Sequence, residues 1–299
     1  MALAAAPTDP LAVDVLFPGG QLLFSARGAA IRVAGAWPPL RRLAPPTSSS
    51  GADAIGSFEA TSAKYTAAGT LVELSVRRYA DASAVAFEQR FPHGLDAGID
   101  PSPSSPAPQP LAAFPCLSLA TASGAVWRSW HGHWGSFTGV GLRPNNSLVF
   151  TGVPTMPLLF LPANRSGGGG GGVMVAPLGN FTEAAHAADA ETWRHGPNGR
   201  LTSLPAGHTH TTLLVASAAG PTATISAWGR ALRAYHRTDR AAAREADVTL
   251  RKLGLYTDNG AFLNYNKLAG NARRPLPAGA TAEGALRSTL AALRAQAQK

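Results

Sequence analysis

The sequence contains a single cysteine, Cys116, among its 299 residues, so no disulfide can form within the chain. Its neighbours Phe114, Pro115 and Leu117 predict a thiol buried in a strand rather than a reactive nucleophile. Acidic residues are also scarce, because 17 Asp and Glu stand against 26 Lys and Arg and give a formal net charge of +9. The chain lacks any run of about 20 apolar residues, so we expect no membrane-spanning helix.

The excess of positive charge comes mainly from this shortage of acids, and the arginines are widely spread. The densest basic group, between Arg230 and Lys252, fits the solvent side of a helix whose opposite, apolar side contains Ile225, Trp228, Leu232 and Tyr235. A phosphate-binding surface is the alternative interpretation. The six glycines Gly167–Gly172 are not followed by the Lys-Ser/Thr pair of a phosphate loop. We therefore predict no nucleic-acid partner, no membrane partner and no cofactor.

The first two-thirds of the chain contain short apolar stretches separated by segments rich in Gly, Pro and Ser. Many short strands without intervening helices are typical of a β-sandwich or barrel. In Leu71–Tyr79, apolar and polar side chains alternate, which predicts a strand with one apolar face. The predicted strands are Leu11–Phe17, Gln21–Ala26, Ala30–Ala34, Leu71–Tyr79, Ala84–Phe91, Ser147–Thr151, Leu158–Leu161, Val173–Ala176 and Thr211–Ala216.

The pattern changes near residue 222. An amphipathic helix is predicted over 222–246, then a strand over 247–256, a loop, and a second helix that Thr281 caps. A strand, a loop and a helix with a leucine stripe indicate the start of a βαβ unit. We therefore predict a mainly β chain in three parts: a β-sandwich domain over 1–221, a helical linker over 222–246, and the incomplete start of a (β/α)8 barrel over 247–299.

Two H-x-H pairs, His131 with His133 and His208 with His210, are candidates for metal ligation. Alternate residues of a strand share a face, and four histidines could bind zinc. However, no carboxylate follows the first pair closely, and nothing in the sequence brings the two pairs together. We predict no metal site, and a cupin-like metalloprotein stays as a minor alternative.

The segment Thr257-Asp258-Asn259-Gly260 is the most specific chemical signal in the chain. In a (β/α)8 barrel, side chains at the carboxyl end of a strand face the active site. Asp258 at such a position would accept hydrogen bonds from substrate hydroxyls. A tight turn is an equally good interpretation, because Asp-Asn-Gly favours turns.

The longer segment Leu253–Phe262 resembles the LGYWTDNGAYYYY signature of a eukaryotic glycoside-hydrolase-like family. That family is related to the α-galactosidases, raffinose synthases and α-glucosidases. Leu255 and Tyr256 stand where the signature has Tyr-Trp. Earlier segments fit the family in the same order: Phe91-Pro92, Ala176–Phe181 against SPxxNF, Leu204–His208 against IPxGxxH, and Trp228–Tyr235 against WGxxLxxxY.

The resemblance implies an N-terminal β-supersandwich, a linker helix and a catalytic barrel that begins near Asp247. It implies substrate contacts by Asp258, with Asn259 and Tyr256 beside it. Retaining glycosidases use two carboxyls about 5–5.5 Å apart, and we identify no such catalytic pair in this sequence. The expected protein is therefore the N-terminal fragment of a glycosidase acting on α-glycosides, inactive alone because its catalytic acids would lie beyond the C-terminus.

The alternative is a non-enzymatic carbohydrate-binding or interaction module. Aromatic side chains stack on sugar rings, and Trp127, Trp130, Trp134 and Trp193 are candidates for such a surface. Of these, Trp130 and Trp134 are predicted to contact the carbohydrate. The two hypotheses share carbohydrate as the expected partner, and they differ in whether these tryptophans lie exposed together or are buried in the core.

Overall fold

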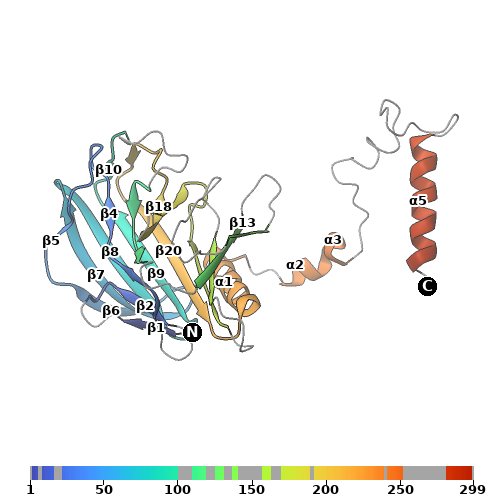
Figure 1. Cartoon of the computed structure of the whole chain (residues 1–299), viewed down its shortest axis with the longest axis horizontal. Helices are drawn as coiled ribbons and strands as arrows, with labels where there is room; N and C mark the ends of the chain where they lie inside the picture. The colour runs from blue at the N-terminus through green and yellow to red at the C-terminus, as the bar shows by residue number, and fades with distance from the viewer. Residues whose placement is uncertain are drawn as a thin grey trace. The chain divides into compact units, whose positions relative to one another are not determined.

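The computed structural model describes residues 2–5, 9–16, 22–99, 110–118, 125–130, 137–140, 157–162, 170–188, 192–238, 241–251 and 281–297 (Figure 1). The chain divides into two compact units, Met1–Asp239 and Arg240–Lys299. The first unit is mainly β. In the described part of the second unit, the secondary structure consists of helices. None of the described helices is both long enough and apolar enough to cross a lipid bilayer.

The larger sheet of the first unit has ten antiparallel strands in the order β14-β13-β15-β16-β20-β9-β8-β7-β5, and β6 also pairs with β7. Its strands are β5 (Arg41–Arg42), β6 (Thr47–Ala52), β7 (Ser57–Ala67), β8 (Thr70–Tyr79), β9 (Ala84–Phe91), β13 (Ala125–Trp130), β14 (Phe137–Val140), β15 (Leu158–Pro162), β16 (Gly172–Pro177) and β20 (His208–Ser217).

The smaller sheet has six antiparallel strands in the order β1-β2-β3-β12-β18-β17. These are β1 (Ala2–Ala5), β2 (Val13–Leu16), β3 (Leu22–Arg27), β12 (Cys116–Ser118), β17 (Ala184–Ala188) and β18 (Thr192–Pro197). Two short pairs complete the described strands: β4 (Ala30–Ile31) with β11 (Ala112–Ala113), and β10 (Leu95–Asp96) with β19 (Ser203–Leu204).

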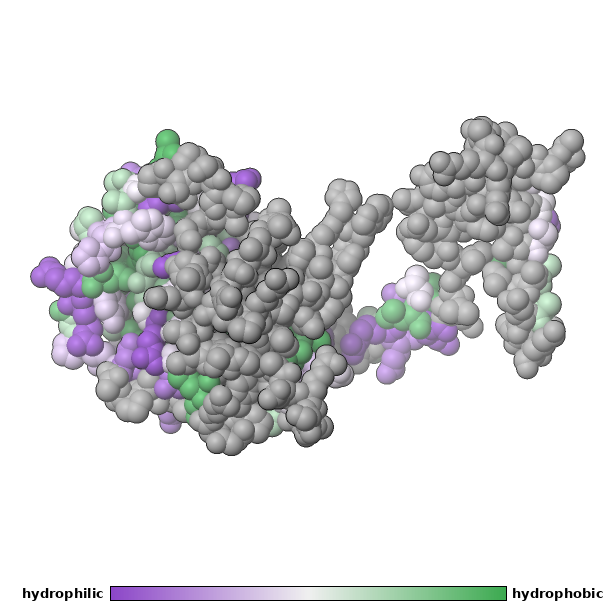
Figure 2. Space-filling model, in the orientation of Figure 1, coloured by the Kyte–Doolittle hydropathy of each residue, from purple (hydrophilic) through white to green (hydrophobic). Residues whose placement is uncertain are grey.

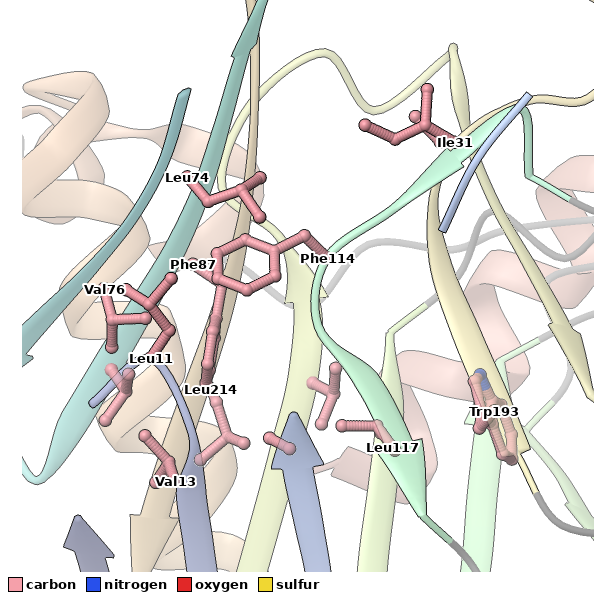
Figure 3. Close-up of a cluster of buried hydrophobic side chains, with 14 of the residues drawn as sticks. Leu11, Val13, Ile31, Leu74, Val76, Phe87, Phe114, Leu117, Trp193 and Leu214 are labelled. Atoms are coloured by element: carbon pink, nitrogen blue, oxygen red, sulfur yellow. The ribbon is translucent and has the colours of Figure 1, made fainter. Parts of the chain in front are cut away.

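The main hydrophobic core contains side chains from both sheets (Figure 3). The larger sheet contributes one face of each strand to this core. In β8, for example, Val72, Leu74 and Val76 are buried on one face, whereas the residues between them face outward. Phe160 of β15 connects the two sheets, because its ring lies 5.1 Å from Phe24 and 5.5 Å from Trp193. Each large side chain buried in this way stabilises the fold by about 1.5–3 kcal/mol.

Helix α1 (Pro221–His236) covers part of the opposite, outer face of the larger sheet, against β16 and β20. Ala231, Trp228 and Leu232 pack there on Leu213 and Val215 of β20. The predicted apolar stripe is thus confirmed for Trp228 and Leu232, whereas Tyr235 at its end is 42% exposed.

The predicted single helix over 222–246 is wrong in length, because α1 ends at His236. Arg237 follows with a φ of 54°, a left-handed conformation that stops the helix. The N–H of Thr238 then donates to the carbonyl of Arg233 at 2.9 Å. A separate short helix, α2 (Ala241–Ala246), comes after the break.

The second unit differs from expectation at its start. The strand predicted over 247–256 is wrong over its described part, where α3 (Val248–Arg251) is helical. Asp247 explains the turn, because its carboxylate accepts bonds from both the N–H and the hydroxyl of Thr249. Further on, α5 (Ala282–Ala297) confirms the predicted second helix, and the Thr281 hydroxyl accepts the Gly284 N–H at 3.1 Å. The barrel unit itself stays a prediction.

Arg32, directly after β4, is fully buried and connects two distant loops. Its guanidinium donates to the carbonyls of Ala97 at 3.1 Å and Gly98 at 3.2 Å. On the other side it donates to the carbonyls of Gly199 and Leu201, both at 2.9 Å. A charged side chain at this depth is held by these charge-assisted hydrogen bonds to the backbone.

Candidate functional site

Most residues predicted to contact substrate lie outside the described part of the chain: Tyr256, Asp258, Asn259 and Trp134. Trp130 is the last residue of β13, and its backbone pairs with Phe137 of β14. The histidine pair His131 and His133 also falls outside the described residues. These assignments therefore stay predictions.

The structure brings together parts of the chain that overlap or directly follow three of the segments carrying the family resemblance. They meet at one corner of the sandwich, which we call the motif corner: residues 178–183 between β16 and β17, residues 208–211 at the start of β20, and Tyr235-His236 at the end of α1. The Asn180 side chain donates to the Thr209 carbonyl at 3.3 Å. His236 Nε2 lies 2.9 Å from the Leu178 carbonyl oxygen. These two hydrogen bonds thus join residues that are 29 and 58 positions apart in the sequence.

Asn180 gives the motif corner its shape. Its φ of 52° is left-handed, a conformation that Asn tolerates better than most residues. The turn closes when the Glu183 N–H donates to the Asn180 carbonyl at 3.1 Å. Phe181 is thereby left 43% exposed, with its ring 5.6 Å from that of His236. Tyr235 is 42% exposed on the other side of His236, so the corner presents aromatic surface to solvent.

Glu183 links this corner to the interior through two histidines of β20. Its Oε1 lies 3.2 Å from His208 Nε2 and 3.6 Å from His210 Nδ1. Burial works against ionisation of Glu183, but the neighbouring histidines His210 and His208 hold the pKa of its carboxyl below the ordinary value. The H-x-H pair thus shares one face of β20, as predicted, and it meets a carboxylate that no sequence motif indicates.

A row of three buried histidines continues inward from His210. The His210 ring lies 5.5 Å from His195 of β18, which lies 4.3 Å from His186 of β17. The row therefore crosses from the larger to the smaller sheet. The Trp193 indole N–H donates to His186 Nδ1 at 3.3 Å, which makes this nitrogen the acceptor. Trp193 itself is completely buried, so it takes no part in a tryptophan-lined binding surface.

His195 is held as a neutral ring. Its Nδ1 lies 2.7 Å from the Thr212 hydroxyl, which donates in turn to the Phe114 carbonyl at 3.2 Å. Because the hydroxyl proton is used in that second bond, His195 Nδ1 must carry the proton that Thr212 accepts. Its Nε2 has no hydrogen-bond partner among the described residues. Burial, with the adjacent His186 and His210, holds the pKa of His195 well below its ordinary value.

His210 is also fully buried, and burial lowers the pKa of its ring despite the carboxylate of Glu183. Within the described part of the chain, no group of three or more His, Cys, Asp or Glu side chains is arranged to hold a metal ion. The cupin-like alternative depended on His131 and His133 joining His208 or His210, and it is not tested. The row of histidines is best described as a polar seam inside the sandwich. Sequence alone did not indicate His186 or His195, because only the strand pairing places them beside each other.

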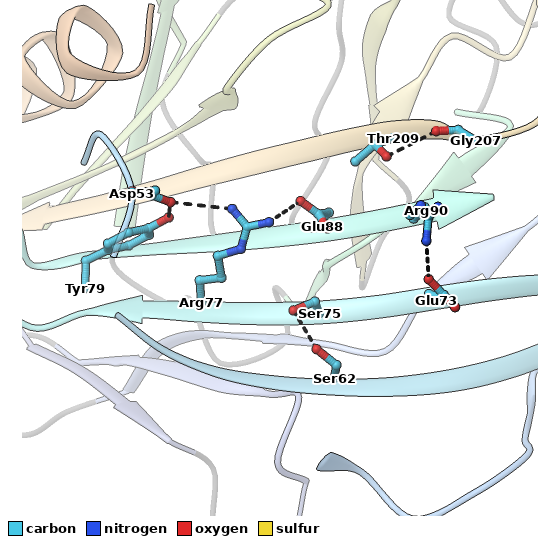
Figure 4. A network of polar contacts seen from close by, with 10 residues as sticks. All are labelled: Asp53, Ser62, Glu73, Ser75, Arg77, Tyr79, Glu88, Arg90, Gly207 and Thr209. Atoms are coloured by element: carbon cyan, nitrogen blue, oxygen red, sulfur yellow. Dashed lines mark hydrogen bonds and ion pairs between the residues drawn. The ribbon is translucent and has the colours of Figure 1, made fainter. Parts of the chain in front are cut away.

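A second polar cluster lies on the outer face of the larger sheet (Figure 4). Arg77 of β8 pairs with Glu88 of β9 at 2.5 Å and with Asp53 at 3.5 Å. The Tyr79 hydroxyl donates to Asp53 at 2.6 Å, and burial together with that carboxylate raises the pKa of Tyr79. Burial works against the charge on Arg77, yet Glu88 and its other neighbours raise the pKa of the guanidinium.

The same face continues with a second group of charges. Glu73 accepts from Arg90 at 2.9 Å, and Lys64 lies 3.3 Å from its other carboxylate oxygen. Between the two groups, the Ser62 hydroxyl donates to that of Ser75 at 2.9 Å. The ion pairs and hydroxyls therefore form an ordered polar layer across β7, β8 and β9.

Comparison with known proteins gives only weak structural likenesses. No family model matches the sequence, and a search of curated proteins gave no match. Solved structures do match, and the likeness is to N-terminal regions of sugar-processing enzymes. The galactosidase domain of an α-galactosidase–sucrose kinase has a TM-score of 0.41 at 12% identity, over 64% of this chain and 30% of that one.

Two further structures are similar in the same limited sense. A GH36 α-galactosidase from Geobacillus stearothermophilus, solved with raffinose, has a TM-score of 0.40 at 12% identity, over 74% of this chain and 32% of that chain. A putative kojibiose phosphorylase from the human microbiome has a TM-score of 0.31 at 11% identity, over 72% of this chain and 26% of that chain. The chain thus spans about a third of the length of these enzymes or less. Likenesses this weak assign no activity to it.

Proposed function

We propose that the chain is the β-sandwich part of a glycoside-hydrolase-like protein that recognises α-glycosides. The observation that supports this most is the motif corner. Asn180 and Phe181, His208, and Tyr235 come from three separate segments chosen for their resemblance to one family. The contacts that join these parts of the chain are Asn180 with Thr209, Phe181 with His236, and His208 with Glu183. Each pairs a matched residue with a residue just outside a matched segment. This proximity of the three parts of the chain is what supports the proposal.

In this proposal, recognition of the sugar depends on Asp258, with Asn259 and Tyr256 beside it. A carboxylate accepts hydrogen bonds from two neighbouring hydroxyls of one sugar ring. Trp130 and Trp134 belong to the first unit, and we propose them as carbohydrate contacts of the sandwich itself. We assign no pair of catalytic carboxyls among the described residues, so we expect this chain to bind α-glycosides without cleaving them.

The test is binding of the full chain to matched α- and β-linked galactosides and glucosides, measured by calorimetry, with free sugar measured in parallel. We expect saturable binding of an α-linked ligand, weakened at least tenfold by Asp258→Asn. Asp81→Asn, in an exposed turn of the sandwich, is the matched control and leaves affinity unchanged. A preference for β-linked ligands, or equal affinity of the Asp258→Asn variant, would contradict the proposal. Turnover would contradict the expectation of binding without cleavage.

The second candidate function is carbohydrate binding by a sandwich that takes no part in catalysis. The ordered polar layer over β7, β8 and β9 favours this candidate. It lies on a rigid sheet, it presents both donors and acceptors, and it does not depend on any residue of the barrel signature.

A further inference from the structure

The polar layer on the outer face of the larger sheet forms the floor of a groove of about 630 Å³. This volume lies within the range of about 300–1,000 Å³ that small-molecule sites occupy. Strand β6 and residues 44–45 contribute to the lining together with β7, β8 and β9. In the space-filling view, hydrophilic side chains gather around smaller apolar areas over the part of the surface that these strands occupy (Figure 2).

The register of the strands sets the polar groups of the groove in rows. Ser62, Ser75 and Glu88 are direct cross-strand partners, and they form one row across β7, β8 and β9. The next row on the same face, two residues along each strand, consists of Lys64, Glu73 and Arg90. Successive rows are separated by about 7 Å, twice the rise of a strand residue. Donors and acceptors therefore recur along the groove at regular intervals.

The groove carries no net charge, although the whole chain has a formal charge of +9. Its lining contains three acids and three bases. All six take part in ion pairs with one another. The central ones, Arg77 and Glu88, are only 25% and 21% exposed. A charged ligand would have to compete with these pairs, whereas a neutral polyol can hydrogen-bond to them without unpairing any charge.

One end of the groove is aromatic. Phe58 lines it, and its ring packs edge-on against that of Tyr79 with 5.7 Å between the centroids. The Arg77 guanidinium lies 5.5 Å from the centre of the Phe58 ring, so the charged and aromatic groups hold each other in place. Side chains fixed by such contacts lose little further entropy when a ligand binds.

We propose that this groove binds a neutral oligosaccharide, with sugar hydroxyls on the rows of ion pairs and an apolar sugar face toward Phe58. The proposal deepens the second candidate function, because it names the binding site and the class of ligand. It is independent of the motif corner and of Asp258. The floor of small hydroxyl side chains leaves room for the rings, and the paired charges provide directional hydrogen bonds.

The experiment is an array of neutral oligosaccharides of four to six units, α- and β-linked, followed by calorimetry on the best ligand with the full chain. Ser62→Tyr fills the floor of the groove from a half-buried strand position. Thr66→Tyr also introduces a tyrosine on the same face of β7, but outside the groove, and serves as its control. Tyrosine is favoured in strands, so both variants should fold, which circular dichroism and thermal melting verify.

We expect Ser62→Tyr to weaken binding of the neutral ligand at least tenfold, and Thr66→Tyr to leave it within twofold of the original. A sulfated oligosaccharide of equal length should bind more weakly in 0.15 M salt.

If no neutral oligosaccharide binds, or if folded Ser62→Tyr binds as well as the original chain, the groove is only a solvated sheet surface. Loss of affinity in Asp258→Asn alone would sink this inference and leave the first proposed function standing. If the ligand whose binding needs the groove is β-linked, this inference would stand and the first proposed function would be contradicted.

Discussion

At the scale of single residues, Arg32 shows how much of this fold depends on one buried cation. Its four hydrogen bonds to carbonyls tie residues 97–98 to residues 199–201. Truncation to Ala would remove all four bonds from a fully buried position. The Ala97 carbonyl would keep the Gly35 N–H as a donor, whereas the buried Gly199 carbonyl would lose the donor that Arg32 supplies. Arg32→Ala should therefore lower the free energy of unfolding by about 3–5 kcal/mol.

Urea unfolding followed by tryptophan fluorescence measures this loss. Arg41→Ala, an exposed arginine of β5, is the control and should cost less than about 0.5 kcal/mol. A loss below 1 kcal/mol for Arg32→Ala would mean that the loops are held by other contacts.

The buried histidines make a second prediction at this scale. His195 is neutral in the fold and has a lowered pKa, whereas in the unfolded chain it titrates near its ordinary value of 6.5. The unfolded state thus binds more protons below about pH 6.5, and stability falls as the pH falls. The maximum contribution of one such group is about 1.4 kcal/mol per pH unit.

Thermal melting between pH 7.5 and pH 5 checks this expectation. His195→Gln should flatten the dependence on pH, while His93→Gln, at an exposed position, should leave it unchanged. Above pH 5, the change in stability with pH comes from the histidines and not from Glu183. The pKa of Glu183 is lowered in the fold, so the stability that its ionised carboxylate contributes is lost only in stronger acid. An unchanged slope in His195→Gln would show that the seam takes up protons without unfolding.

At the scale of secondary structure, β18 and β11 pack unusually closely at Gly196. A Cβ at this position would overlap the carbonyl group of Ala112. Because backbone atoms cannot move aside as a flexible side chain does, Gly196→Ala should destabilise the fold by about 2–4 kcal/mol. Gly179→Ala is the matched control, since nothing lies within 4 Å of a Cβ there. Urea unfolding of the two variants should differ clearly, and equal stability would refute the close packing.

Several elements were predictable from sequence, and the misses have physical causes. Strand β9 was predicted at its observed bounds because it is a short, mostly apolar stretch. Strand β8 was predicted to within one residue because apolar side chains alternate with polar ones along it. Strand β7 was missed: its buried positions include Ala60, Ala63 and Ala67, and alanine gives little periodic signal. Cys116 lies in a strand, as predicted, but it is partly exposed rather than buried.

Only those features of the candidate site that lie within a single strand could be predicted from the sequence. The spacing of His208 and His210 predicted a shared face, and the structure confirms it. The contacts of Glu183 and His195 depend instead on which strands are neighbours and on how the two sheets face each other. No local pattern contains that information. The buried fate of Trp193 follows from the same topology, which sets its strand inside the smaller sheet.

At the scale of the whole molecule, the formal charge of +9 makes one more prediction. Basic residues spread over the surface attract polyanions without forming a specific site. Binding to duplex DNA or heparin should therefore be weak and should disappear by about 0.15–0.2 M salt, where screening acts over about 8 Å. Fluorescence anisotropy with labelled DNA at rising salt tests this. Sequence-dependent binding that persists at 0.2 M salt would reverse our prediction of no nucleic-acid partner.

The four bonds of Arg32 have a further consequence for where such a fold can work. A chain with one cysteine cannot use an internal disulfide to hold its loops together, and here a guanidinium joins two loops instead. A guanidinium stays charged at any physiological pH and is not reduced or oxidised by thiols. This cross-link therefore keeps the same strength in reducing and oxidising surroundings, which makes the loops it joins indifferent to the redox state of the compartment.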